Sequence, residues 1–345
     1  MTSIFLKGVF AKCKFHGSGD AQVMISDAEV YALICIAIHD LDWSYSELGV
    51  AAIAFPTFNY YQIDLHWFDQ LNITGLTPGK ILTCLDSCIK KDSDFSLYIE
   101  NMSALHRRRV KYKRILSQQP LPTMDQIGPR VLLEYGRCDI ELLANWMIWR
   151  KWIYDIDNRS AQETGYLFEP VLASCLGGEA IGARNSPIKR LDSDGMPTAT
   201  GRQIDCFIPA TNTVYEFKLR VTIAASGQGR FGEELSFPVE SQAAGYRPIL
   251  IVLDPSPSTR LTELSQNFIR CGGEFYQGEA AWSHLEQQSG SIISVFIEKY
   301  IKPAIQDVES INIVDIQPLT LSWENGNVTI SSHDHRYIVE RSSKE

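Results

Sequence analysis

Apolar and polar residues recur with a helical period over most of the first third of the chain. A helix is predicted to begin at Asp27 and to run to about His39, and another spans about Gly79 to Ile89. A proline-punctuated segment, 119–137, separates this region from a tryptophan-bearing helix over about Cys138 to Asp157. The pattern therefore predicts a mainly helical region over residues 1–118 and a linker or contact loop over 119–137.

The second half of the chain changes to short strands. Residues 201–221 read GRQIDCFIPATNTVYEFKLRV, in which two short apolar runs flank the turn-prone segment Ala210–Thr213. Short β-branched and aromatic runs around such a turn predict a β-hairpin. Because alternate side chains on a strand share a face, Glu216, Lys218 and Arg220 should point to one side. The opposite side is apolar and should anchor the strand in a core.

A helix is expected just before this hairpin. Ser160 and Glu163 form a capping box that would start the helix, and Gly177-Gly178 would end it. Pro170 falls inside the pattern and should kink the helix. Glu169 lies between two small residues on one helical stripe, so it is the candidate for an acid that leans over the hairpin. A surface glutamate at the edge of the stripe is the alternative.

Asp205 and Glu216 are the candidate metal ligands. Two carboxylates brought together across a hairpin make a hard oxygen site suited to Mg²⁺. Lys218 beside them can position or activate a water, or stabilise charge on a phosphate. The pattern outlines metal-assisted hydrolysis of a phosphodiester. The alternative is that these charges are solvated on an exposed sheet face and pair across strands.

In this order the elements resemble the PD-(D/E)xK nuclease superfamily, and most of all type II restriction endonucleases. The resemblance rests on a helix with Glu169, a strand with Asp205, a strand with Glu216 and Lys218, and then another helix and strand, at about 240–246 and 248–254. It covers roughly residues 138–285. The proline of the motif is absent, since Ile204 precedes Asp205.

The resemblance implies a mixed central β-sheet flanked by helices, in an α/β catalytic core over residues 138–310. It also implies Mg²⁺-dependent, sequence-specific cleavage of double-stranded DNA by a homodimer, with Glu169, Asp205, Glu216 and Lys218 as catalytic residues. Gln242 matches the polar helix residue that many such nucleases place beside the site. Region 1–118 would serve target recognition or dimerisation, and 119–137 would be a linker or contact DNA. A β-hairpin tail with a turn at Asn325-Gly326 is predicted within 311–345.

Two other functions compete with this interpretation. A DNA-repair or junction nuclease would share the same core, and a non-catalytic DNA-binding or scaffold protein would carry the acidic hairpin as a structural element only. The net charge of −9 argues mildly against a nucleic-acid partner. The positive charges are nevertheless concentrated, in a basic cluster at residues 106–114 and again around the hairpin.

These concentrated charges supply the candidate DNA contacts. The candidates are Arg107, Arg108, Arg109, Lys111, Lys189, Arg190, Arg202, Arg220, Gln228 and Arg230. For the basic cluster the alternative is a solvated helix face. Gln228 and Arg230 lie in a glycine-rich segment, 224–234, that is expected to be a DNA-contacting loop or a plain flexible connector.

The remaining features bear on compartment and packing. The 8 cysteines fall mostly in apolar runs without a CxxC pair, which indicates buried thiols in a reducing cytoplasm. No signal-peptide pattern or membrane-spanning run is present, so a cytoplasmic protein without membrane contact is expected. Trp146 and Trp149 share a helix face, which predicts core packing or a subunit interface. His39, His333 and His335 are expected to be structural or surface residues.

Overall fold

The computed structural model describes residues 3–15, 23–134, 139–219, 228–311 and 318–341. A five-stranded mixed sheet, in the order β1-β4-β5-β6-β7, forms the centre of the second half of the chain. β1 (Glu179–Ile181), β4 (Ile204–Ile208) and β5 (Thr213–Lys218) pair antiparallel. β6 (Arg247–Val252) and β7 (Glu274–Gln277) continue the sheet in parallel with β5. The predicted β4–β5 hairpin is confirmed; its turn contains η3 (Pro209–Thr211) and a left-handed Asn212.

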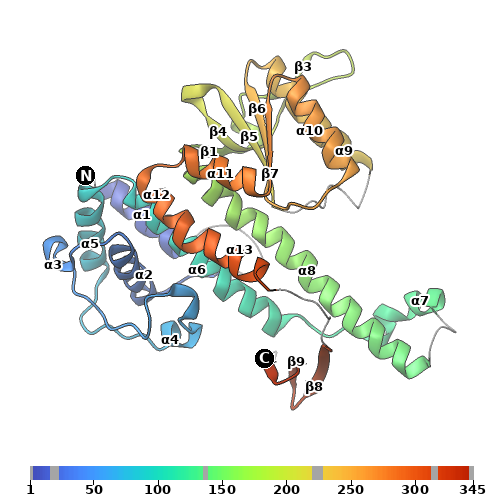
Figure 1. Ribbon diagram of the computed structural model, residues 1–345, viewed down its shortest axis with the longest axis horizontal. Coiled ribbons are helices and arrows are strands. Elements are labelled where there is room, and N and C mark those ends of the chain that lie inside the picture. The colour runs from blue at the N-terminus through green and yellow to red at the C-terminus, as the bar shows by residue number, and fades with distance from the viewer. Residues whose placement is uncertain (1–2, 16–22, 135–138, 220–227, 312–317, 342–345) are drawn as a thin grey trace.

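Helices cover both faces of this sheet (Figure 1). α8 (Ile140–Cys175) and α11 (Glu279–Gln288) pack on one face, where Leu172 and Leu285 meet Tyr215 and Phe217. α9 (Gln228–Ala243) and α10 (Thr259–Arg270) cover the other face. Apolar side chains on both faces make the central strands a buried layer, as expected for parallel pairing. The predicted fold class, a mixed central sheet flanked by helices, is confirmed.

The N-terminal region is mainly helical, as predicted. It contains α1 (Ser3–Lys14), α2 (Asp27–Asp40), α3 (Tyr45–Leu48), η1 (Tyr60–Gln62), α4 (Leu65–Asp69), α5 (Pro78–Lys91) and α6 (Phe95–Gln118). The predicted helices at 27–39 and 79–89 are α2 and α5. α2 is buried along most of its length, and Ser26 caps it through a capping box. In the described part of the chain, no helix has the length and apolar character needed to cross a membrane.

The chain returns to this helical region after the sheet. α12 (Ser291–Phe296), the π-helical turn η4 (Ile297–Ile301) and α13 (Lys302–Glu309) follow α11. Buried side chains from Ile292 to Ile301 belong to the same apolar core as α2, α5 and α6. The predicted core, 138–310, therefore includes a segment that packs with the N-terminal helices. Helical periodicity identifies an apolar face but does not identify its packing partner.

Two predicted boundaries are wrong. Ser160 does not start a helix, because α8 runs without interruption for 36 residues through that position. The buried Ser160 hydroxyl instead accepts a hydrogen bond from Arg108, at 2.9 Å. Segment 119–137 is not only a loop, because it contains α7 (Met124–Glu134), which packs on α8 through Ile127 and Leu143. α7 lies at the end of α8 that projects from the rest of the molecule (Figure 1).

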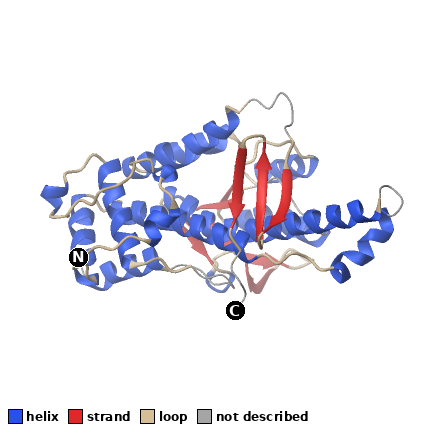
Figure 2. Ribbon diagram, turned by 90° about the horizontal axis from the view of Figure 1, so that it is seen from below, coloured by secondary structure: helices blue, strands red, loops and turns tan. Residues whose placement is uncertain are grey.

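Two small sheets complete the fold, and the strands stand out among the helices in Figure 2. β2 (Lys189–Leu191) and β3 (Pro197–Gly201) form one; η2 (Ala183–Asn185) precedes them. β8 (Thr320–Glu324), β9 (Asn327–Ser332) and β10 (His335–Val339) form the other. The predicted turn is confirmed, with φ of 52° at Asn325 and 78° at Gly326. β10 extends the predicted hairpin to three strands, which pack on Ile115 and Trp152.

Candidate active site

Asp205 is held in place by its own hydrogen bond to the neighbouring strand. It precedes Cys206, which pairs with Tyr215 in the β4–β5 ladder. The Oδ2 atom of Asp205 accepts a hydrogen bond from the backbone N–H of Phe217, at 3.0 Å. A side-chain carboxylate thus satisfies an amide of β5, and the side chain is only 9% exposed. This bond fixes the acid beside Glu216.

Glu216 and Lys218 lie on one face of β5, as the alternation predicts. The Lys218 Nζ atom lies 2.9 Å from the Glu216 Oε1 atom, and both side chains are about one-fifth exposed. Tyr215 and Phe217 point to the opposite face and are buried against α8 and α11. The structure therefore presents a carboxylate and an ammonium at the end of a strand whose reverse face is fixed in the core. Arg220, predicted on the same face, lies outside the described residues.

Glu169 on α8 reaches the same acidic group. Burial, together with the nearby Glu216 carboxylate, raises the pKa of Glu169. Burial also raises the pKa of Asp205 well above its usual range, and the charges of Glu216 and Glu169 add to this effect. These three carboxylates lie close together away from solvent, so each disfavours the ionisation of the others. A bound cation would offset this repulsion. The structure thus brings together all four predicted catalytic residues.

Glu234 is a further carboxylate at the site that the sequence interpretation missed. Its Oε1 atom lies 3.2 Å from the Lys218 Nζ atom. Its Oε2 atom is buried and has no hydrogen-bond partner among the described residues. The prediction of a loop over 224–234 is wrong from residue 228 onward, because α9 begins there. The signal that could have located Glu234 is its helical spacing from the buried Phe237 and Ser241, which the nearby glycines obscured.

Gln242 does not lie beside the acidic residues. It is exposed and lies two turns beyond Glu234 on α9. β6 follows α9 and begins at Arg247, which pairs with Thr213 at the start of β5, whereas Lys218 lies at its end. The prediction that Gln242 supports the site is therefore wrong in this structure. The helix presents a different polar residue, Glu234, at the correct end.

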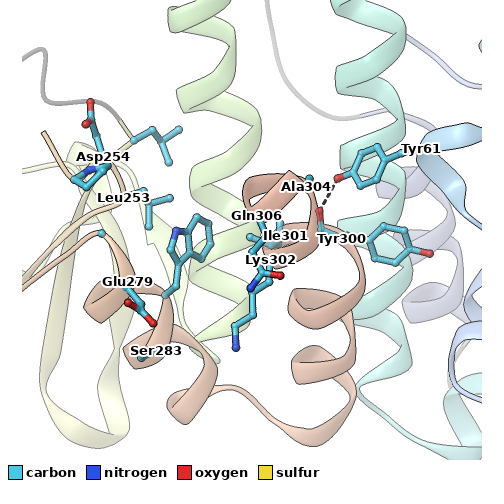
Figure 3. Close-up of a pocket in the computed structure, with 14 residues that line it drawn as sticks. Tyr61, Leu253, Asp254, Glu279, Ser283, Tyr300, Ile301, Lys302, Ala304 and Gln306 are labelled. Atoms are coloured by element: carbon cyan, nitrogen blue, oxygen red, sulfur yellow. Dashed lines mark hydrogen bonds between the residues drawn. The ribbon is translucent and has the colours of Figure 1, made fainter. Parts of the chain in front are cut away.

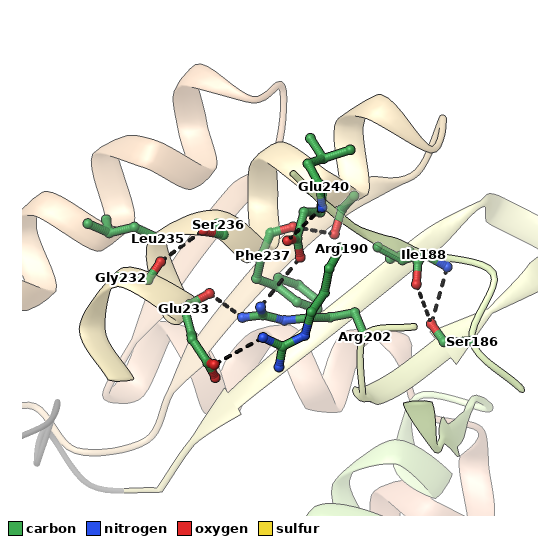
Figure 4. A network of polar contacts seen from close by, with 12 residues as sticks. Ser186, Ile188, Arg190, Arg202, Gly232, Glu233, Leu235, Ser236, Phe237 and Glu240 are labelled. Atoms are coloured by element: carbon green, nitrogen blue, oxygen red, sulfur yellow. Dashed lines mark hydrogen bonds and ion pairs between the residues drawn. The ribbon is translucent and has the colours of Figure 1, made fainter. Parts of the chain in front are cut away.

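Arg190 and Arg202, predicted to contact DNA, instead hold α9 (Figure 4). The guanidinium of Arg190 pairs with Glu233 at 3.0 Å. Arg202 pairs with Glu240 at 3.4 Å, donates to the backbone carbonyl of Glu233 and is 9% exposed. Glu240 also accepts a hydrogen bond from the backbone N–H of Leu191, at 3.3 Å. These contacts join α9 to the β2–β3 sheet and occupy the two arginines within the protein.

The basic cluster at residues 106–114 is also largely internal. Arg107 is 3% exposed and donates to the carbonyls of Lys12 and Cys13 at the end of α1. Arg109 donates to the carbonyls of Tyr60 and Ile63, at 3.0 and 2.9 Å. Lys111 is buried, and Arg108 bonds to Ser160. The prediction of phosphate contacts does not fit these positions, because the three arginines bind backbone and hydroxyl oxygens and Lys111 is buried inside the fold.

Lys189 remains partly exposed on β2, among the predicted DNA contacts. Gln228 and Arg230 lie in the first turn of α9, and their side chains are outside the described residues.

The cysteines of the described residues are free and buried, as predicted; Cys138 is outside them. His39 stacks on Phe58 at 3.7 Å, and His333 and His335 are exposed, which agrees with structural and surface roles.

A cavity of about 850 Å³ lies beyond the end of β6, between the sheet and the returning helices (Figure 3). Leu253, Asp254 and Glu279 line one side, and Tyr300 and Lys302 line the other. Leu219, which also lines it, follows Lys218 but packs with the opposite, apolar face of β5. The four carboxylates around Lys218 do not line this cavity, so we do not place the chemistry there.

The donor set at the acidic residues fits a hard divalent cation. Mg²⁺ needs only one or two carboxylates and otherwise keeps its waters. No group of three metal-ligating side chains is preassembled among the described residues. Asp205 and Glu216 are adjacent across the two strands, so theirs are the two carboxylates that could hold such an ion.

Comparison with known proteins identifies the family of the chain. The chain is similar to the type II restriction enzyme ApaLI of Acetobacter pasteurianus, with 43% identity over 342 residues that cover 94% of this chain and 90% of the relative. No solved structure matches the chain. The model of the ApaLI-like restriction endonuclease family matches residues 60–302, which include Glu169, Asp205, Glu216, Lys218 and Glu234. The chain therefore belongs to the ApaLI-like restriction endonuclease family.

Proposed function

We propose that this restriction endonuclease hydrolyses double-stranded DNA at a specific sequence, in a Mg²⁺-dependent reaction at the acidic residues of β4 and β5. One observation carries the proposal. Asp205, Glu216 and Lys218 converge where the central strand β5 ends beside the start of β4, with the Asp205 carboxylate fixed by the Phe217 amide and the Lys218 ammonium fixed by Glu216. Family membership favours discrete cleavage of target sites over the repair or junction nucleases that share such a core.

Each residue has a separate role in this proposal. Asp205 and Glu216 would hold the metal ion, which would polarise the scissile phosphate when bound. Lys218 donates hydrogen bonds to the phosphate oxygens or to the attacking water, because the surrounding carboxylates keep it as an ammonium. Glu169, on α8, lies close enough to Glu216 for the two carboxylates to disfavour each other's ionisation, and a bound cation would favour the charged form of both. The scissile P–O bond breaks as the oxygen of water bonds to phosphorus.

The metal-ligand assignment is tested by Asp205→Ala and Glu216→Ala. Both variants should lose cleavage of plasmid DNA in Mg²⁺, while binding to a cognate fragment in EDTA is retained or strengthened. Removal of a carboxylate takes away a ligand and also relieves repulsion against phosphate. Lys90→Ala, which breaks an exposed pair with Asp86, is the control. Near wild-type cleavage by either acidic-site variant would overturn the assignment.

Lys218 is tested in the chemical step itself. With enzyme and DNA pre-bound and the reaction started by Mg²⁺, Lys218→Ala should slow strand scission by about 10²-fold or more. DNA affinity should change much less, because Asp205 and Glu216 remain. Lys218→Arg should not restore the rate, since a planar guanidinium cannot occupy the position of a compact ammonium between two carboxylates. Full activity of Lys218→Ala would refute the proposed site.

We also propose that the enzyme acts as a homodimer, and that α8 supplies part of the interface. Leu142, Trp146 and Ile153 share one stripe of α8 and are 62%, 56% and 48% exposed. Spacings of four and seven residues form a continuous apolar seam, which antiparallel pairing with a second copy would bury. Trp146→Glu should produce a monomer in sedimentation analysis. Met24→Glu, at another exposed position, should leave the dimer unchanged. A dimeric Trp146→Glu variant would refute this interface.

We infer that DNA within the cytoplasm is the target, and that Lys189, Arg220, Gln228 and Arg230 contact it. Lys189 is partly exposed close to α9, whose first turn carries Gln228 and Arg230. Digestion of a sequenced phage DNA, followed by mapping of the ends, would identify the recognition sequence. A smear without discrete fragments would contradict sequence specificity.

A further inference from the structure

We propose that Glu234 is a positioning residue for the reaction: it holds the Lys218 ammonium at the end of β5, beside the proposed metal ligands, independently of Glu216. The inference rests on the proposed function and adds a residue from a separate element. Lys218 lies between two carboxylates, with Nζ 2.9 Å from Glu216 and 3.2 Å from Glu234. One of these acids is on the same strand as the lysine, and the other is on α9.

Glu216 and Glu234 differ in the number of partners that they bind. Glu216 would be shared between the lysine and the metal ion, because it is a proposed metal ligand. Glu234 contacts the lysine with Oε1 alone, and its Oε2 atom is buried without a hydrogen-bond partner among the described residues. A flexible four-carbon side chain that loses one partner would sample other positions. Glu234 therefore supplies the anchor that remains when Glu216 is engaged elsewhere.

α9 is built to keep Glu234 in this position. Phe237 and Ser241, on the same face of the helix, are buried in or beside the apolar layer of β6 and α10. The contacts of Arg190 with Glu233 and of Arg202 with Glu240 join the helix to the β2–β3 sheet on either side of Glu234 (Figure 4). Apolar packing and two ion pairs thus fix the helix that carries the carboxylate. The distance between Glu234 and Lys218 is therefore set by the position of α9 as well as by β5.

The test is a double-mutant cycle measured in single-turnover cleavage. Glu234→Gln keeps the shape of the side chain and removes its charge, so the scission rate should fall by roughly tenfold or more. In the Lys218→Ala background the same substitution should have almost no further effect, because its target is already absent. The Mg²⁺ concentration that gives half-maximal rate and the affinity for DNA in EDTA should stay near wild type. Glu234→Asp, which keeps the charge, should recover part of the lost rate.

Glu263→Gln is the matched control, because it makes the same change at an exposed glutamate of the neighbouring α10. It should cut at close to the wild-type rate. Multiplicative losses in the double variant, an increased Mg²⁺ requirement of Glu234→Gln, or an equal loss in Glu263→Gln would overturn the inference. Wild-type cleavage by Glu234→Gln would also overturn it, while slow cleavage by Lys218→Ala leaves the proposed function intact. Wild-type cleavage by Lys218→Ala and Asp205→Ala would instead remove the proposed site.

Discussion

Replacement of Arg107 by alanine should destabilise the fold but leave the contacts of the protein with DNA phosphates unchanged. Its guanidinium donates to the carbonyls of Lys12, at 2.8 Å, and Cys13. Both carbonyls belong to the last turn of α1, where helical carbonyls lack intrahelical partners and a positive charge is favourable. Hydrogen bonds to charged groups contribute about 1.5–3 kcal/mol each, so the loss of two in the interior should cost roughly 3–6 kcal/mol. That is a large part of a typical free energy of unfolding of about 5–15 kcal/mol.

The assay is urea denaturation followed by tryptophan fluorescence, paired with DNA binding at several salt concentrations. Lys113→Ala on the same helix is the control, because its pair with Asp69 is exposed and 4.0 Å long; its effect should stay within about 0.5 kcal/mol. If Arg107 contacted a DNA phosphate, its loss would reduce the slope of the log of the DNA-binding constant against log salt concentration by about one. An Arg107→Ala variant with wild-type stability and a reduced slope would refute the structural role.

Two further predictions concern the apoprotein. Because the pKa of Asp205 is raised by folding, the folded state binds its proton more tightly than the unfolded chain does, and stability falls as pH rises from about 4 toward that raised pKa. In EDTA, Asp205→Asn should therefore melt at a higher temperature than wild type near neutral pH and depend less on pH; an equal or lower Tm would contradict this. Gly273→Ala would place its Cβ 2.0 Å from the Pro248 carbonyl oxygen and should cost about 1–3 kcal/mol or more. Gly232→Ala, with open space around its Cβ inside α9, should be neutral or stabilising by about 0.5–1 kcal/mol. A lower calorimetric Tm for Gly232→Ala than for Gly273→Ala would refute the argument.

The sequence alone determined the β4–β5 hairpin and the class of fold. Alternation along β5 separated Glu216 and Lys218 from the apolar Tyr215 and Phe217, because the two faces of a strand are fixed by its period of two. Helical periodicity likewise located α2 and α5 and placed Glu169 on the helix before the hairpin. These features depend only on residues that are close together in the chain, so the local sequence pattern is enough to predict them.

Tertiary structure alone decided the partners of the charged residues. The run of cations at 106–114 has the same sequence whether it faces DNA or binds carbonyls inside the protein. Only the burial of Arg107 against α1 shows that this arginine binds carbonyls. The same holds for Glu234 and Gln242, two turns apart on one helix. Only the parallel pairing of β5 with β6 decides which end of α9 lies at Lys218, because strand register joins residues that are distant in the chain.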